Sequence, residues 1–249
     1  GTTTVVGYLM DLERGNQLAV ASRLNPQTRY GDDVISRIGY AGSTEGGLQT
    51  LQRAILDALN EIIAELLERS GYAAHDIYAS TVVCNTTMHH LLLGLDPTWL
   101  ARAPYVPVTS QMQEFVASEL DLAINPSGLV VILPNIAGWV GADTVGVVLA
   151  TRLYEQNEPA LAIDIGTNGE MALGTRERVV TCSTAAGPAF EGAHLSCGMC
   201  CGWGHRGGHD GRRRGPAGYW RNCTTWRMWF WLGRFGGCYA PFRCAHFHR

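Results

Sequence analysis

The stretch Leu161–Glu170, with the sequence LAIDIGTNGE, constrains the fold more than any other part of the chain. Its apolar first half predicts a buried strand, Thr167-Asn168-Gly169 predicts a tight hairpin turn, and residues 170–173 predict the returning strand. Small residues in such a turn expose backbone N–H groups that can hold a phosphate, and Asp164 at the strand end can hold Mg²⁺ through water. The alternative is an ordinary hairpin in which the local backbone satisfies the aspartate.

The start of the chain looks like a second copy of this unit. Gly1-Thr2-Thr3 leads into a β-branched run that continues to Leu9, but no leading strand and no aspartate stand before it. Two such turns in one chain predict two lobes that close on one nucleotide. We therefore expect the sequence to be a fragment whose first lobe lacks its first strand.

Composition changes near residue 200. Residues 1–199 hold 10 Arg and 21 acidic residues, whereas residues 200–249 hold nine Arg, one acidic residue, five of the eight Cys and no Val or Ile. A segment without branched aliphatic residues cannot easily bury a core. We expect residues 200–249 to be disordered or to come from a shifted reading frame.

Two other interpretations of this tail stay open. One is a basic, aromatic segment that contacts nucleic acid through Arg212–Arg214 and the tryptophans at 226, 229 and 231. The other is a metal-binding module, although only Cys197-x-x-Cys200 has the spacing of a zinc half-site. Its candidate ligands are Cys197, Cys200, Cys201, Cys223, Cys238, Cys244, His246 and His248.

The sequence shows no membrane span and no targeting signal. The chain has a formal net charge of −3 and no apolar run of about 18 residues, and it lacks the basic start and apolar centre of a signal peptide. We expect a cytoplasmic protein with no membrane span.

The rest of the chain alternates predicted strands and helices. Apolar spacing from Leu48 to Leu66 predicts an amphipathic helix that Gly71 ends, and Asp32 is the expected N-cap of an earlier short helix. We also expect a turn into a short helix at 85–94, helices at 111–122 and 144–152 and a helix start at 184–192. Strands are expected at 3–9, 18–23, 77–84, 128–134 and 178–183.

Several patches, taken together and in this order, resemble one family. They are Gly1–Thr4, Asn25–Gln27, Arg29–Val34, Asn85–Met88, Pro134-Asn135 with Gly141–Asp143, Asp164–Glu170 and Gly187–Gly192. The family is the reductive activators of corrinoid-dependent proteins, in their C-terminal part, and the likeness covers residues 1–199. These proteins belong to the ASKHA superfamily of acetate and sugar kinases, heat-shock chaperones and actin.

The resemblance implies an α/β fold of ribonuclease H-like lobes, truncated here. Residues 1–155 would form the first lobe, residues 156–199 the start of the second lobe, and residues 200–249 the tail. The adenosine side of the site would come from the absent part of the second lobe. We therefore expect weak or no ATP binding by this chain alone, and whether the fragment is an active enzyme stays open.

The resemblance also implies a function for the parent protein. It would couple ATP and Mg²⁺ to reduction of a partner's corrinoid from Co(II) to Co(I), with the electron coming from a [2Fe–2S] domain ahead of Gly1. Cys84, Cys182 and Cys197 are too scattered to hold that cluster. The partner would be a corrinoid iron–sulfur protein or the corrinoid subunit of a methyltransferase, with a homodimer possible and no nucleic acid or membrane involved.

The site residues implied by the resemblance fall into three groups. The residues expected to contact phosphate are Thr2, Thr3, Gly166, Thr167 and Asn168. Asp164, the expected catalytic residue, would hold Mg²⁺ through water. Gly187 and Glu191 would form the nucleotide wall.

Two other functions stay open. The acidic first lobe is also suited to a non-catalytic module that docks on a partner or dimerises. A phosphotransferase resembling sugar or acetate kinases is a further option, which we disfavour because no general base stands out in the sequence.

Overall fold

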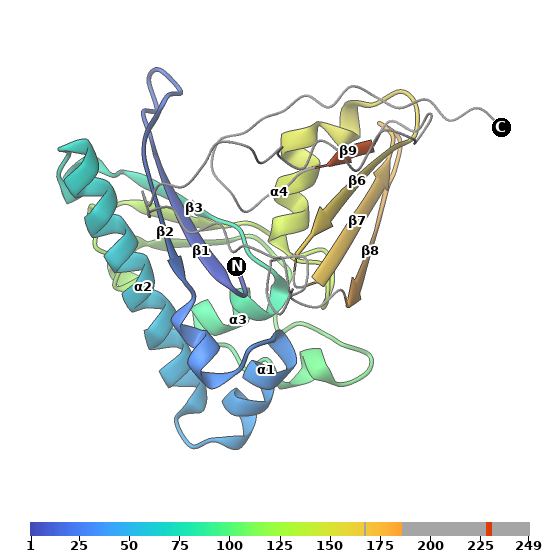
Figure 1. The fold of residues 1–249 in the computed structure, drawn as a ribbon, viewed down its shortest axis with the longest axis horizontal. Coiled ribbons are helices and arrows are strands. Elements are labelled where there is room, and N and C mark those ends of the chain that lie inside the picture. Colours follow the sequence, from blue (N-terminus) through green and yellow to red (C-terminus); the bar gives the residue numbers. More distant parts are fainter. Residues whose placement is uncertain (167, 186–227, 231–249) are drawn as a thin grey trace, which may run out of the picture. The chain divides into compact units, whose positions relative to one another are not determined.

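The structure is a computed structural model that describes residues 1–166, 168–185 and 228–230. The chain divides into two compact units, the first spanning Gly1–Leu149 and the second beginning at Ala150. Figure 1 traces their elements. Each unit is described below by itself.

The first unit holds two small sheets. Its strands β1 (Thr4–Met10) and β2 (Gln17–Leu24) form an antiparallel hairpin. In the second sheet the order is β3-β5-β4, with β3 (Ala79–Val82) parallel to β5 (Leu129–Ile132) and β4 (Gln113–Val116) antiparallel to it. Among the described residues β1 and β3 each have one partner strand, so each lies at a sheet edge.

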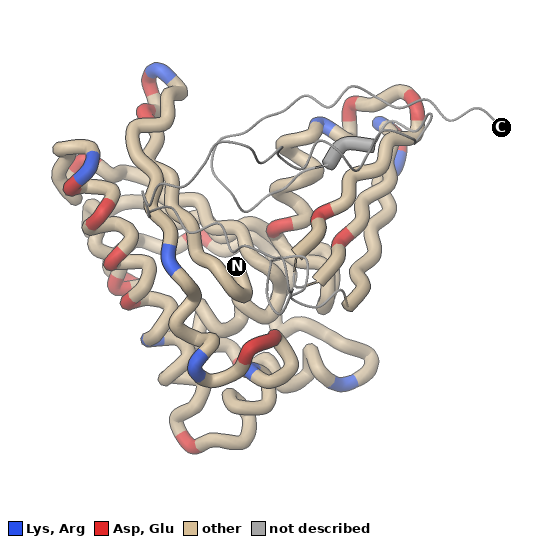
Figure 2. The backbone as a smooth tube through the Cα atoms, in the orientation of Figure 1, with Lys and Arg blue, Asp and Glu red and all other residues tan. Residues whose placement is uncertain are grey.

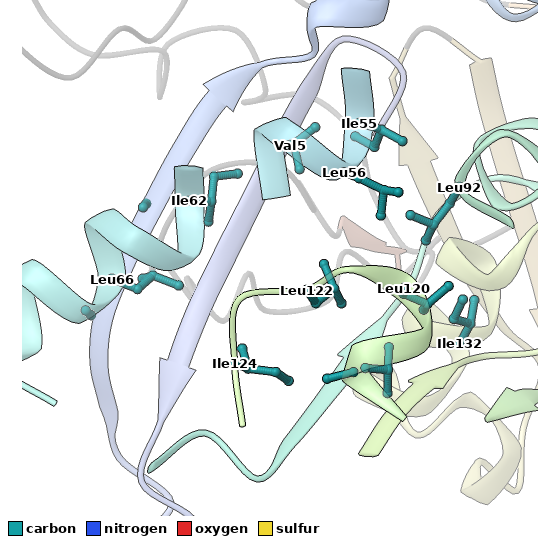
Figure 3. Packing of buried hydrophobic residues seen from close by; sticks show 14 residues of the cluster. Val5, Ile55, Leu56, Ile62, Leu66, Leu92, Leu120, Leu122, Ile124 and Ile132 are labelled. Carbon is teal, nitrogen blue, oxygen red and sulfur yellow. The ribbon is translucent and has the colours of Figure 1, made fainter. Parts of the chain in front are cut away.

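Helix α2 (Gly47–Ser70) carries the core of this unit. It confirms the helix predicted from the leucine and isoleucine spacing, and Gly71 caps it in the left-handed conformation with φ 75°. Buried α2 residues such as Ile55 and Ile62 pack with side chains of both sheets, among them Val5 and Ile132 (Figure 3). The two sheets therefore share one hydrophobic cluster.

The outer side of α2 is charged, and acidic positions recur along it (Figure 2). Arg23 from β2 forms ion pairs with Glu61 at 3.3 Å and Glu65 at 3.4 Å. Arg69 also pairs with Glu65 and donates to the Val20 carbonyl. These contacts hold the hairpin against the helix, although such exposed pairs stabilise weakly.

Polar side chains cap the helices α1 and α3. Asp33 caps α1 (Val34–Ser43), one residue after the expected Asp32, because its carboxylate accepts the Ser36 N–H at 2.7 Å. Asn85 caps α3 (Thr86–Leu93). The other helical segments are α4 (Ala142–Thr151) and the short 3₁₀ turns η1 (Pro26–Tyr30), η2 (Ala74–Asp76), η3 (Thr98–Ala101), η4 (Ala117–Leu120) and η5 (Leu153–Glu155).

The helix predicted for residues 111–122 is wrong. The segment divides into β4 and η4, because the backbone of Gln113–Val116 pairs with β5 along its whole length. Glu119 then accepts the Val116 N–H at 2.8 Å and starts the 3₁₀ turn. Pairing with a strand distant in sequence overrode the local helical pattern.

The second unit is built on the LAIDIGTNGE stretch. Strands β6 (Ala160–Ile165), β7 (Asn168–Gly174) and β8 (Val179–Ala185) form an antiparallel meander. The predicted hairpin is present, but Asn168 and Gly169 lie in β7 rather than in the turn. Thr184 and Ala185 belong to β8, not to the expected helix start, whose remaining residues lie outside the described part.

The tail contributes one described element. Strand β9 (Met228–Phe230) pairs parallel to β6, with Ala162 opposite Trp229. The other residues of 200–249 lie outside the described part, so the expectation for the tail stays a prediction. In the portion of the chain that the structure describes, no helix is long and apolar enough to cross a bilayer.

Candidate nucleotide site

The candidate site in the first unit lies at the carboxyl ends of β3 and β5. These strands are parallel, so the segments that follow them leave the sheet at the same edge. Asn85 follows β3, and Asn135 follows β5. This edge is where ligands bind in open α/β sheets.

The Gly1–Thr3 turn is fixed at this edge by two asparagines. Asn85 Nδ2 donates to Thr2 Oγ1 at 2.7 Å, and Thr2 is completely buried. Asn25 Nδ2 donates to the Gly1 carbonyl at 2.9 Å, while the Asn25 N–H donates to the Thr3 carbonyl at 2.8 Å. The first predicted phosphate turn is therefore held in place by Asn25, the N-cap of η1, and Asn85, the N-cap of α3.

Gly141 brings the loop before α4 against the same point. A Cβ at this position would lie 2.5 Å from the Asn85 Cα and 2.7 Å from the Thr86 nitrogen, so only glycine fits without a backbone shift. The Asp143 N–H donates to the Cys84 carbonyl at 3.2 Å. The loop thereby places the Asp143 backbone beside the end of β3.

Cys84, just after β3, is a neutral thiol and not a thiolate. Burial raises the pKa of the Cys84 thiol to about 12, and the Asp143 carboxylate adds to the rise. The neutral thiol packs as a small apolar group in the cluster with Met88 and Leu91.

Asn135 and Thr144 carry buried polar atoms that lack partners. Both atoms of the Asn135 amide and the Thr144 hydroxyl have no hydrogen-bond partner among the described residues. Buried polar groups are rarely left unsatisfied in folded proteins. A polar ligand at this edge, such as a phosphate with its water, fits donors and acceptors of this kind.

In the second unit, Asp164 lies directly opposite Glu170 in the β6–β7 pair. Opposed residues of an antiparallel pair share a face, with Cβ atoms about 5 Å apart. Ser183 Oγ on β8 donates to Glu170 Oε1 at 3.3 Å, and Glu170 is buried. Two carboxylates side by side form an oxygen donor set suited to Mg²⁺.

The structure places the predicted site residues in two separate units. Thr2 and Thr3 lie in the first unit, and Asp164, Gly166 and Asn168 lie in the second. The Gly166 N–H donates to the Asn168 carbonyl at 3.0 Å, so this amide closes the turn rather than pointing to a ligand. Thr167, Gly187 and Glu191 lie outside the described residues.

Sequence reasoning gave no role to four residues that the geometry brings forward. They are Asn85, Asn135, Asp143 and Glu170. The signal available for the two asparagines was their position directly after predicted strands. Glu170 would have followed from pairing the hairpin strands, which puts it opposite Asp164.

Comparison with known proteins decides the family. A family profile described as the RACo middle region matches residues 1–156. The chain belongs to the RACo family. A second profile, the C-terminal ASKHA domain of RACo, matches residues 158–204.

Two curated relatives are similar to parts of this RACo chain. The corrinoid activation enzyme RamQ of Eubacterium limosum is 42% identical over 199 residues, which are 80% of this chain and 33% of RamQ. The [Co(II) methylated amine-specific corrinoid protein] reductase of Methanosarcina barkeri is 46% identical over 70 residues, 28% of this chain and 13% of the reductase. The chain spans about a third of the length of RamQ.

A solved structure shares the fold as well. The reductive activator for corrinoid, iron–sulfur protein is 44% identical and superposes with a TM-score of 0.77, covering 80% of this chain and 32% of that one. The mixed α/β ASKHA architecture expected for this RACo chain is therefore confirmed.

Proposed function

We propose that this RACo chain is part of an ATP-dependent reductive activator that returns a corrinoid protein from Co(II) to Co(I). The observation that carries the proposal is the turn at Gly1–Thr3, held by Asn25 and Asn85 at the carboxyl edge of β3 and β5. Further support comes from two relatives, because RamQ is named a corrinoid activation enzyme and the solved structure is named a reductive activator for corrinoid, iron–sulfur protein.

In this proposal each unit has its own phosphate contacts. In the first unit they are Thr2 and Thr3. In the second they are Thr167 and Asn168, with Gly166 closing the turn through its bond to the Asn168 carbonyl and with Gly187 and Glu191 as the nucleotide wall. Asp164, beside Glu170, holds Mg²⁺ through water. Asp164 and Glu170 would hold the ion, which would neutralise phosphate charge.

In this proposal the reducing electron comes from a [2Fe–2S] cluster. A [2Fe–2S] cluster needs four closely placed ligands, typically cysteines. In the described ranges no group of three or more His, Cys, Asp or Glu is placed to hold a metal, and Cys84 and Cys182 lie in different units. We propose that a [2Fe–2S] domain delivers the electron and that a corrinoid iron–sulfur protein or a methyltransferase corrinoid subunit accepts it.

ATP hydrolysis by the full-length gene product, with and without the Co(II) corrinoid protein, tests this proposal. We expect hydrolysis that depends on the corrinoid protein, and we expect Asp164→Asn to lower the rate by about 10²-fold or more. Asp121→Asn is the matched control, because Asp121 is an exposed carboxylate in the first unit, with 73% of its side chain accessible.

Each alternative function has its own outcome in the same assay. No hydrolysis with any partner favours a non-catalytic docking or dimerisation module. Transfer of phosphate to acetate or a sugar favours a kinase. Either result would refute the proposal.

A further inference from the structure

Arg37 on α1 is a charged side chain in the interior of the first unit. It is completely buried, and the described residues include no carboxylate within ion-pair distance of it. Its Nη2 has no hydrogen-bond partner among those residues. Burial lowers the pKa of Arg37 to about 10 against the fields of Asp33 and Asp32, so it still carries its charge at neutral pH. A buried, unpaired charge is costly.

One series of hydrogen bonds joins this charge to the start of the chain. Arg37 Nη1 donates to Gln27 Oε1 at 3.4 Å, and the same oxygen accepts from Asn25 Nδ2 at 3.2 Å. Asn25 Nδ2 in turn donates to the Gly1 carbonyl at 2.9 Å. Gln27 and Asn25 are both completely buried.

A second series runs through α3. The Met88 sulfur lies 3.3 Å from Arg37 Nη1 and 3.8 Å from Asn25 Nδ2. The Met88 N–H donates to Asn85 Oδ1 at 2.9 Å, and Asn85 Nδ2 donates to Thr2 Oγ1 at 2.7 Å. Arg37 is thus connected to Gly1 and Thr2 by two buried routes.

We propose that Arg37 is a positioning residue for the Gly1–Thr3 turn, acting through Gln27, Asn25 and Asn85. The Arg37 Nε also donates to the Gly31 carbonyl at 2.9 Å, which anchors the guanidinium in one orientation. With the guanidinium fixed, Asn25 Nδ2 stays directed at the Gly1 carbonyl and Asn85 Nδ2 at Thr2 Oγ1. The inference rests on the proposed function in one respect, since it takes the turn to be where phosphate binds.

The groups that Arg37 contacts in this network are neutral amides, a carbonyl and a thioether. A carboxylate next to Arg37 would cancel its positive potential, whereas amides transmit orientation and leave the potential in place. A positive potential beneath the turn favours an anion there, because interactions are weakly screened inside a protein.

The test compares Arg37→Met and Arg37→Lys with Leu122→Ala in the full-length gene product. Met keeps the apolar stem without the donors, and Lys keeps the charge without the fork. Leu122 is buried in the other cluster of the first unit and makes no contact with the network that the structure records, so its variant controls for general destabilisation (Figure 3).

The first measurement is hydrogen–deuterium exchange of the peptide Gly1–Leu9. We expect Arg37→Met to speed exchange in this peptide about tenfold more than Leu122→Ala does, the loss expected for a hydrogen bond to a charged group. Equal exchange in the two variants would overturn the positioning role.

The second measurement is ATP hydrolysis. We expect Arg37→Met to raise KM for ATP about tenfold with a smaller change in kcat, and Arg37→Lys to recover part of it. Unchanged KM would overturn the anion part of the inference. If the wild type does not hydrolyse ATP at all, the proposed function fails, and the exchange result still decides whether Arg37 positions the turn.

Discussion

At the scale of single residues, His89 and His90 are both completely buried in α3. His90 Nδ1 bonds the Thr86 carbonyl at 2.7 Å, and its Nε2 accepts the Val108 N–H at 2.9 Å, so the ring is neutral with its proton on Nδ1. His89 has no hydrogen-bond partner on either ring nitrogen within the described residues. The pair therefore acts as a structural, uncharged element.

This arrangement makes stability depend on pH. Burial, aided by His90, lowers the pKa of His89 to about 4, whereas an unfolded histidine has a pKa of about 6.5. The unfolded chain thus binds the proton first, and stability falls as pH drops from about 6.5 towards 4, by roughly 3 kcal/mol at most. Urea unfolding at pH 8 and pH 5 measures the loss.

His89→Gln should remove the contribution of His89 and leave that of His90, whose pKa burial also lowers. His75→Gln, at an exposed histidine, should leave the pH dependence intact. An equal loss of stability between pH 8 and pH 5 in wild type and His89→Gln would show that other groups cause it. Asp33 and Asp96 do not interfere, because hydrogen bonds lower their pKa values and they titrate below this range.

At the scale of elements, the sequence was most informative where the signal is local. The α2 stripe, the Gly71 cap and the β6–β7 hairpin were all predicted, since each depends on neighbouring residues. The helix predicted for 111–122 failed because β4 forms only by pairing with β5. For the candidate site, the two glycine turns could be predicted from the local sequence. The contact of Thr2 with Asn85 could not, because it joins residues 83 positions apart.

The packing of Gly141 against Asn85 gives a prediction at this scale. Gly141→Ala should destabilise the first unit by about 1–3 kcal/mol, because the new methyl group would overlap backbone atoms of the α3 cap. Thermal unfolding measures it. Gly39→Ala in α1 is the control, since a Cβ there meets nothing within 4 Å and alanine favours a helix. Similar unfolding of both variants would contradict the close packing.

At the scale of the whole molecule, the composition divides the chain near residue 200, and the structure describes strands on both sides of that boundary. The first unit has a shared core, and the second unit rests on the meander to which β9 adds a strand. Composition alone could not predict β9, because Met228–Phe230 pairs with a strand more than 60 residues earlier in the chain.

The measurement that tests the central claim most directly is the absorption spectrum of a corrinoid protein during reactivation. The full-length gene product, an electron donor and the Co(II) corrinoid protein are mixed without oxygen, with Mg-ATP, with Mg-ADP or with no nucleotide. The account predicts that Co(I) accumulates only with Mg-ATP. Co(I) formed to the same extent without nucleotide, or no Co(I) in any mixture, would contradict it.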